Sequence, residues 1–329
     1  DLEKRAEDCG SVRELMELYK QTLDYFMGLQ VETEHINDEI HIQQDINAFR
    51  SSLVYDCIER AMDLVEGGSV YSADGGPTAG TISAGDSLAA LDEIVFNQKL
   101  LTMEQVLHAM STNYEDMETV PAGPEIRAIL LNKAPKFGND DERADKWVVE
   151  LEDYIGSSYR YKYRSSKYGK GPVPCCYSYS QSPVTGNIAF GKSIGATPDG
   201  RKAGQPVNNG ISPANGSEKK GATAACNSVM KLPSIWFQKG AIFNMRLSKG
   251  ALDTDENKEK VIAMIKVLFE NYGQQIQFNV VDNKVFKKAM EHPDEYKDLM
   301  VRVSGYSALF TSLSPECQMD VINRAELEL

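Results

Sequence analysis

The sequence of 329 residues predicts an α/β fold, and three observations support that prediction. Apolar residues recur at helical spacing in the first half, as in amphipathic helices that pack on a core. Two short segments near the C-terminus, 275–281 and 299–303, alternate apolar and polar residues, which is typical of half-buried strands. Helical patterns lie between and after these strands, and strands that alternate with helices are typical of α/β proteins.

Helices dominate the first 160 residues. We predict a helix over 11–28, capped by Ser11, that continues as a polar helix toward the mid-forties. Further helices are predicted at 50–65, from Asp86 onward, and at 103–112, 124–133 and 141–160. The small-residue segment 75–87 is predicted to be a loop. It lacks the lysine of a phosphate-binding loop, so it does not predict a nucleotide site.

The composition changes between residues 165 and 250. Glycine, proline, asparagine and serine dominate there, which predicts loops and short strands such as 173–179 and 241–247. Helical spacing returns at 255–272, with Gly273 as its stop. Ser314 and Pro315 are typical of a helix start, and they open a last helix that is predicted to reach about residue 326.

Charge and hydropathy narrow the class of protein. The net charge of −13 disfavours a nucleic-acid partner, because phosphate backbones are repelled by an acidic surface. No stretch approaches the about 20 consecutive apolar residues of a membrane span. We therefore expect a cytoplasmic protein without a membrane partner. No metal site is predicted, because the spacing of His35 and His41 matches no usual pair of ligands.

The segment with the most chemical information is Val301-Arg302-Val303-Ser304-Gly305-Tyr306-Ser307-Ala308, close to the C-terminus. Alone, Ser-Gly-Tyr-Ser also fits an ordinary hairpin turn. The full segment resembles the radical loop of glycyl radical enzymes, the family of pyruvate formate-lyase, diol dehydratases, choline lyase and arylacetate decarboxylases. The resemblance implies that Gly305 stores an unpaired electron on its α-carbon. It also implies that the loop is supported by Arg302, Ser304, Tyr306, Ser307 and Arg324, the last in the closing helix.

Other segments resemble the same family, so that the resemblance runs from about residue 50 to the end. They are 56–60, 195–201, 209–213 and 276–281. The resemblance implies the C-terminal half of a ten-stranded barrel surrounded by helices, with the glycine hairpin inserted in the barrel. It implies a barrel part at 1–200 and a glycine radical domain at 201–329. We expect the hairpin to be buried, because oxygen destroys the radical.

One family feature has no match in this chain. Glycyl radical enzymes relay the radical through a cysteine, often in Gly-Cys-x-Glu, hundreds of residues before the glycine, and that motif is absent here. Cys176, in the pair Cys175-Cys176, is the alternative. We expect a fragment or one subunit of a split enzyme, whose partner is the missing N-terminal half of the barrel.

The resemblance also implies further partners. An activating enzyme with S-adenosylmethionine and an iron–sulfur cluster would install the Gly305 radical, and no cofactor is expected in this chain itself. The complete enzyme is expected to be a homo-oligomer. A small iron–sulfur subunit is a further possible partner.

Two segments bear on the substrate. The sequences of 221–228 and 234–240 are most similar to arylacetate decarboxylases, which implies cleavage of 4-hydroxyphenylacetate to p-cresol and carbon dioxide. Glu66 is the candidate for a carboxylate beside the phenol, and a carboxylate at the end of a surface helix is its alternative interpretation. Two other functions stay open. One is a lyase or dehydratase acting on a diol, choline or hydroxyproline, and the other is a non-catalytic spare part that restores a damaged enzyme.

Overall fold

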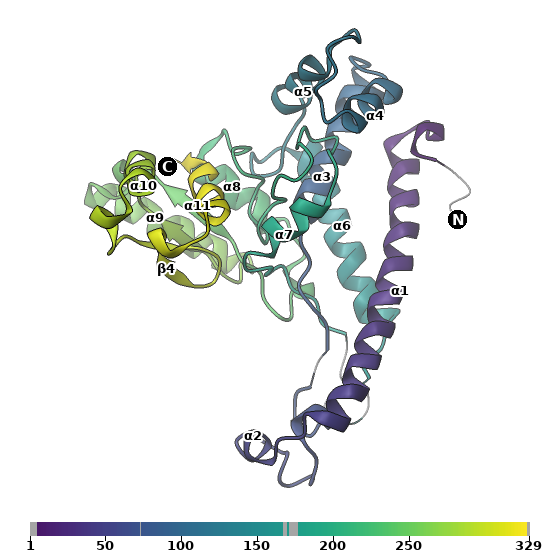
Figure 1. Cartoon of the computed structure of the whole chain (residues 1–329), viewed down its shortest axis with the longest axis vertical. Helices are drawn as coiled ribbons and strands as arrows, with labels where there is room; N and C mark the ends of the chain where they lie inside the picture. Colours follow the sequence, from purple (N-terminus) through teal and green to yellow (C-terminus); the bar gives the residue numbers. More distant parts are fainter. Residues whose placement is uncertain (1–4, 73, 167–169, 171–176, 328–329) are drawn as a thin grey trace.

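The computed structural model describes residues 5–72, 74–166, 170 and 177–327, and it confirms an α/β fold (Figure 1). The α-helices are α1 Val12–Gln44, α2 Ala48–Ser52, α3 Thr81–Ala90, α4 Met103–Ser111, α5 Gly123–Asn132, α6 Glu142–Tyr161, α7 Gly186–Ser193, α8 Gly221–Met230, α9 Asp255–Glu270, α10 Asn283–Glu291 and α11 Pro315–Asn323. The strands are β1 Asn244–Leu247, β2 Gln277–Asn279, β3 Met300–Arg302, β4 Ser307–Leu309 and β5 Glu326–Leu327. No helix among the described residues is both long and apolar enough to cross a membrane.

Helix α1 runs along one edge of the molecule, from near α4 down to α2 (Figure 1). It begins as predicted, because the Ser11 side chain accepts a hydrogen bond from the backbone N–H of Glu14. Met16 is fully buried in a cluster that also holds Trp147 and Leu151 of α6. The apolar stripe of α1 thus packs on α6.

The segment that follows α1 differs from the prediction of a helix over 50–65. Helix α2 ends at Ser52, and the chain then turns through left-handed residues at Asp56 and Ala61. The buried carboxylate of Asp63 organises these turns, since it accepts hydrogen bonds from the Ser51 hydroxyl at 2.7 Å and from the Asn47 N–H at 3.0 Å. Such local hydrogen bonds compete with helix formation.

Helix α3 begins at Thr81, inside the segment predicted to be a loop. Its small residues serve a packing role. A Cβ on Gly85 would lie 2.3 Å from a methyl group of Val148, so that α3 and α6 approach each other closely only without a side chain there.

Two helices of the segment 165–250 were not predicted. Helix α8 has small and polar residues that are typical of loops, yet its inner face is completely buried against the core. Tertiary packing therefore outweighs a weak helical propensity. Helix α7 was missed for the same reason. Strand β1 lies within the predicted strand 241–247, whereas most of the predicted strand 173–179 lies outside the described residues.

A parallel sheet forms beneath the C-terminal elements. Strand β1 lies at its centre, with β2 on one side and β5 on the other. Parallel bridges extend the arrangement from Gln181 to Ala241 and from Asp74 and Pro77 to residues 177 and 180. Strand β5 was not predicted. Helix α11 ends at Asn323, three residues earlier than predicted, because the chain then extends to pair with β1.

The predicted hairpin is confirmed. Strand β3 pairs antiparallel with β4, and the tip carries Ser304, Gly305 and Tyr306. One side of the hairpin is anchored by a small apolar cluster of Val301, Val303, Phe286, Phe310 and Val321. The hairpin therefore packs on α10 and α11 and lies next to β2.

Candidate active site

The backbone of Gly305 is in the left-handed region, with a φ of +78°. Only glycine adopts this conformation without strain. A Cβ at this position would also lie 3.3 Å from the Cδ1 atom of Ile242, which is tighter than an ordinary van der Waals contact. The turn and the close approach to the sheet therefore both favour glycine at the tip.

Hydrogen bonds hold both peptide groups that flank the α-carbon of Gly305. Its N–H donates to Oε1 of Gln277 on β2 at 3.1 Å, and its carbonyl accepts from Nη2 of Arg302 at 3.2 Å. Arg302 Nε also donates to the same Gln277 oxygen at 2.8 Å. The glycine is thus fixed between a side-chain amide and a guanidinium.

The polar face of β2 carries this arrangement. Asn279 bonds the hairpin backbone twice, since it donates to the Arg302 carbonyl at 2.7 Å and accepts from the Arg302 N–H at 2.9 Å. Strand β2 lies within the predicted strand 275–281, but the prediction of a half-buried strand is met only in part, because the two amide side chains, Gln277 and Asn279, are buried against the hairpin and Phe278 is half-buried. We did not predict either residue as part of the site. Two amides on one face of a strand were the available signal.

Other predicted residues also lie at the hairpin. Ser304 is buried and donates from its hydroxyl to Oδ1 of Asn209 at 2.9 Å. Arg324 is buried, donates to the Val303 carbonyl at 2.7 Å and pairs with Asp320 at 3.1 Å. The side chain of Ser307 accepts from Arg302 Nη1 at 3.3 Å, and Tyr306 contributes its carbonyl to the Val303 N–H at 2.9 Å.

Charged groups are concentrated beneath the hairpin. Arg246 is buried, and it pairs with Glu326 at 3.1 Å. Burial raises the pKa of Glu218 to about 8, although Arg246 and Arg324 nearby act in the opposite direction. The Oε2 atom of Glu218 is buried without a hydrogen-bond partner among the described residues. This region therefore holds its cations and carboxylates in a poorly solvated environment.

The expectation of a buried hairpin tip is not met within this chain, where Gly305, Tyr306 and Ser307 are exposed. The physical reason is one-sided packing. The sheet, Ile242 and the apolar cluster cover one side of the hairpin, and among the described residues the opposite side of the tip stays open.

Two predicted residues lie elsewhere. Glu66 ends a short 3₁₀ helix, Leu64–Glu66, where its carboxylate accepts a hydrogen bond from the Asp63 N–H at 2.8 Å. This is a helix-capping contact. The helix packs on α1, and Figure 1 places the neighbouring α2 far from β4 and the hairpin. Cys176 lies outside the described residues.

Comparison with known proteins identifies the family. The family model described as "Pyruvate formate lyase-like" matches residues 3–190, and the one described as "Glycine radical" matches residues 207–311. The chain therefore belongs to the glycyl radical enzymes of the pyruvate formate lyase-like family.

Three relatives illustrate this membership. "Probable dehydratase YbiW" of Escherichia coli (strain K12) is 36% identical over 95% of this chain and 38% of its own length. "Trans-4-hydroxy-L-proline dehydratase" of Clostridioides difficile is 33% identical over 96% of this chain and 38% of its own length. The solved structure of glycerol-bound B12-independent glycerol dehydratase from Clostridium butyricum has a TM-score of 0.91, 34% identity, and coverage of 99% of this chain and 40% of that one.

The chain thus spans about two fifths of the length of these relatives. The structural match confirms that its fold is the corresponding part of the glycyl radical enzyme barrel. The division into 1–200 and 201–329 stays a prediction, as do the individual roles of the hairpin residues.

Proposed function

We propose that this chain carries the radical-storing part of a glycyl radical dehydratase that acts on a small hydroxylated substrate. The observation that carries the proposal is the geometry at Gly305, where a left-handed glycine has hydrogen bonds on both of its peptide groups. The names of the dehydratase relatives support dehydration over decarboxylation.

The hairpin residues suit an electron stored on the α-carbon. A glycyl radical is delocalised between the amide nitrogen and the carbonyl, and this delocalisation needs a planar centre without a side chain. The Arg302 guanidinium beside the carbonyl favours electron density on that oxygen. Gln277 orients the N–H at the other end. Both contacts therefore stabilise the delocalised form.

The proposed reaction balances as a radical dehydration. A cysteine thiol of the complete enzyme gives a hydrogen atom to the Gly305 radical, and the resulting thiyl takes one from a substrate carbon that bears a hydroxyl. The hydroxyl on the adjacent carbon then leaves as water with the proton of the first hydroxyl, whose carbon becomes a carbonyl. The product radical then recovers a hydrogen atom from the thiol. The cysteine would belong to the remainder of the barrel.

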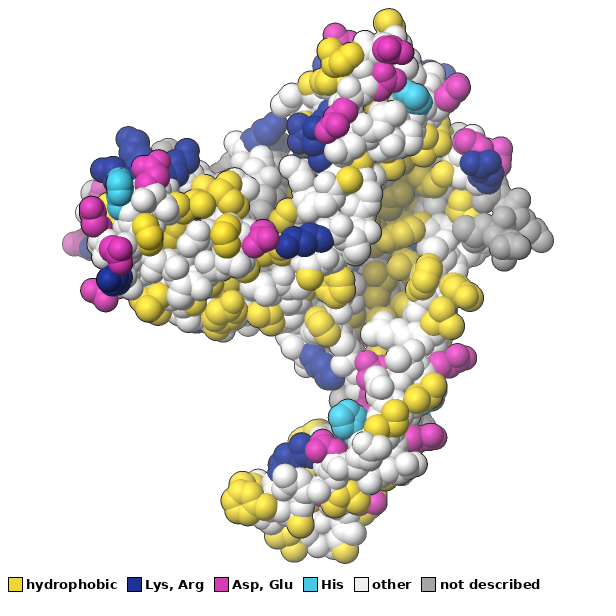
Figure 2. Space-filling model, in the orientation of Figure 1, with side chains coloured by type: hydrophobic (Ala, Val, Ile, Leu, Met, Phe, Trp, Pro, Cys, Tyr) yellow, Lys and Arg dark blue, Asp and Glu magenta, His cyan; other side chains and the backbone are white. Residues whose placement is uncertain are grey.

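The partners form part of the proposal. Exposed apolar side chains gather around α2 and the lower part of α1, at the bottom of Figure 2. They include Phe49, Leu53, Tyr55 and Ile58. Contiguous apolar surface of this kind is typical of interaction sites. We infer that the rest of the barrel packs on this surface. From the exposure of Gly305, Tyr306 and Ser307 we infer that it also covers the open side of the hairpin, and that an activating enzyme with S-adenosylmethionine and an iron–sulfur cluster installs the radical. A cytoplasmic homo-oligomer is the proposed assembly.

Electron paramagnetic resonance tests radical storage. Anaerobic incubation with an activating enzyme should give a doublet, from coupling to the single remaining α-hydrogen, and Gly305→Ala should abolish it. Air should then cleave the activated chain at Gly305, which mass spectrometry of the fragments would locate. Failure of any activating enzyme of the family to give a doublet, with the hairpin intact by NMR, would contradict radical storage on Gly305.

Turnover separates the candidate functions. The chain is combined with the N-terminal remainder of the barrel, activated, and given glycerol, 1,2-propanediol, choline, trans-4-hydroxy-L-proline or 4-hydroxyphenylacetate. Dehydration of a hydroxylated substrate is expected. Release of p-cresol, in an assay that also contains the small iron–sulfur subunit, would instead support decarboxylation. Glu66→Gln would then test the predicted contact with the phenol. Rescue of an oxygen-cleaved relative without any turnover of its own substrate would support the spare-part function.

A further inference from the structure

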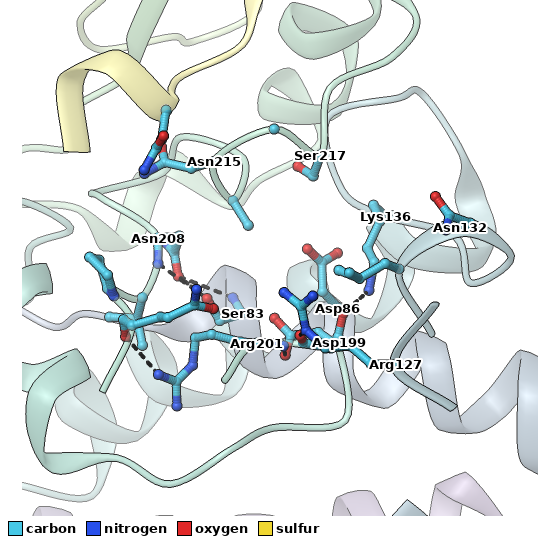
Figure 3. A pocket seen from close by; sticks show the side chains of 18 of the residues that line it. Ser83, Asp86, Arg127, Asn132, Lys136, Asp199, Arg201, Asn208, Asn215 and Ser217 are labelled. Atoms are coloured by element: carbon cyan, nitrogen blue, oxygen red, sulfur yellow. Dashed lines mark hydrogen bonds between the residues drawn. The ribbon is translucent and has the colours of Figure 1, made fainter. Parts of the chain in front are cut away.

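A polar cavity of about 520 Å³ lies apart from the hairpin contacts. It opens between helices α3 and α5 and the loop segments 199–208 and 214–219. Figure 3 shows Asp86, Lys136, Asp199 and Arg127 grouped on one side of it, with Asn215 and Ser217 on the loop opposite. A volume of this size is in the range of small-molecule sites, about 300–1,000 Å³.

Two buried polar atoms that line this cavity have no hydrogen-bond partner among the described residues. The Asp86 side chain is fully buried, and its Oδ1 accepts from the Phe137 N–H at 2.7 Å, whereas its Oδ2 is unpartnered. The Ser217 hydroxyl is the second such atom. An unsatisfied buried polar atom costs about 1–3 kcal/mol, so that a native site is expected to supply a partner.

A buried ammonium lies in the same cavity. Lys136 is 8% exposed, and the described residues give it one hydrogen bond, from its Nζ to the Asp199 carbonyl at 2.8 Å. An ammonium carries three N–H donors, so that two remain for a ligand or water. A buried cation with incomplete hydrogen bonding favours an anionic partner.

The charge of the lining points in the same direction. Four cationic side chains, Arg127, Lys136, Arg201 and Lys219, line the cavity against the two carboxylates of Asp86 and Asp199. This local excess of positive charge stands out in a chain with a net charge of −13. Arg201 is committed to the Gly195 and Gln205 carbonyls, and Arg127 Nε donates to the Gly200 carbonyl at 2.9 Å. Lys219 is exposed, which leaves Lys136 as the buried cation best placed for a ligand.

The raised pKa of Asp86 adds to the local excess of positive charge, because it favours the neutral form of this carboxyl. Burial raises its pKa to about 7, with Lys136 opposing the shift and Asp199 and Asp145 adding to it. Asp145 is itself paired with Lys231 at 2.7 Å. Near neutral pH, Asp86 is therefore a hydrogen-bond donor for much of the time.

We propose that this cavity binds a small oxyanion, held by the Lys136 ammonium and by a hydrogen bond from the Ser217 hydroxyl. Carboxylate, phosphate and sulfonate groups share this chemistry. The lining residues do not include Gln277 or Arg302, which bond Gly305 directly, although Asn215 of the lining donates to Asp320 beneath the hairpin. Asn208, which lines the cavity, bonds Ser83 of α3, whereas the adjacent Asn209 bonds Ser304 of the hairpin.

Calorimetric titration of the chain tests the proposal with acetate, inorganic phosphate and methanesulfonate at constant ionic strength. One saturable site is expected for at least one of these anions. Lys136→Met should weaken binding by at least about tenfold, and Ser217→Ala by about three- to tenfold, the range expected for one hydrogen bond to a charged group. Lys133→Met is the matched control, because Lys133 is exposed in the same segment and is absent from the cavity lining.

Two results would overturn the proposal. One is the absence of saturable binding of all three anions at millimolar concentration. The other is equal weakening by Lys136→Met and Lys133→Met, which would indicate a general charge effect. Ser217→Ala keeps the test decisive if Lys136→Met fails to fold, since the Ser217 hydroxyl has no hydrogen-bond partner to lose among the described residues. The result is independent of radical formation on Gly305.

Discussion

Replacing Arg324 by methionine would remove a buried cation from beneath the radical hairpin. The Arg324 guanidinium is 7% exposed, and it donates to the Val303 carbonyl at 2.7 Å and to the Arg302 carbonyl at 3.4 Å. It also pairs with Asp320, which is 5% exposed. Arg324→Met would thus leave a buried carboxylate without its cation and remove the donor to the Val303 carbonyl, whereas the Arg302 carbonyl keeps its hydrogen bond from Asn279.

The expected loss of stability in Arg324→Met follows from the burial of the Arg324–Asp320 ion pair. Removing one partner of a buried ion pair costs about 3–5 kcal/mol. Asp320 retains two amide donors, from Asn187 at 3.2 Å and Asn215 at 3.1 Å, which lowers the penalty of the unpaired charge. We therefore expect the lower end of the range, about 3 kcal/mol. A domain is stable by only about 5–15 kcal/mol, so that this loss is large.

Urea denaturation measures the loss as a change in the free energy of unfolding. Asp320→Asn in the Arg324→Met background should recover part of the loss, because it removes the unpaired charge. Lys192→Met is the control, since Lys192 of α7 forms an exposed ion pair with Glu316 of α11, the helix that also carries Asp320. It should change stability by less than about 0.5 kcal/mol. A loss below about 1 kcal/mol in Arg324→Met would refute the reasoning that Arg324 supports the hairpin.

Three further predictions use the same denaturation assay. Gly305→Ala should destabilise the chain by about 1–2 kcal/mol because of its left-handed φ, whereas Gly195→Ala, with open space around it, should change little. Asn279→Ala should cost about 2 kcal/mol, from two lost hydrogen bonds to the hairpin backbone. Burial raises the pKa of Asp86 and of Glu152 each to about 7, so the folded chain retains protons that the unfolded chain releases. Stability should therefore fall by about 3 kcal/mol per group from pH 5 to pH 8, and Asp86→Asn or Glu152→Gln should remove that group's share of the fall. A pH profile that neither substitution changes would contradict this prediction.

The sequence predicted long elements well because their signals are local. The helix after Ser11, the helix at 255–272 and the alternation in β2 depend on caps and periodicity within one segment. The errors fall where tertiary contacts decide. Helix α8 forms because its small residues fit a crowded core, and the turns after Ser52 form because Asp63 reaches back to residues of α2.

The candidate site was predicted only in part, for a similar reason. The motif around Gly305 placed Arg302, Ser304 and Arg324 beside the hairpin, because all of them are encoded in its neighbourhood or in the closing helix. The residues on β2 and Asn209 come from distant segments, and the local signal, two amides on one face of a strand, does not say which distant element they contact. Exposure of the tip also depends on packing between segments distant in the sequence, which no local motif reports.

The way in which the hairpin is attached bears on how it would work. The contacts that join β3 to β2 run through side chains, since Asn279 bonds the Arg302 backbone and Gln277 bonds the Gly305 N–H. Each such bond contributes about 1 kcal/mol net. Among the described residues, separating β3 from β2 therefore breaks a few side-chain hydrogen bonds and no backbone ladder. Under the proposed function, an activating enzyme must reach the α-carbon of Gly305, and later the same glycine must return to one fixed position. Attachment by side-chain amides and a buried arginine meets both demands, because it is weak enough to release and specific enough to restore a single geometry.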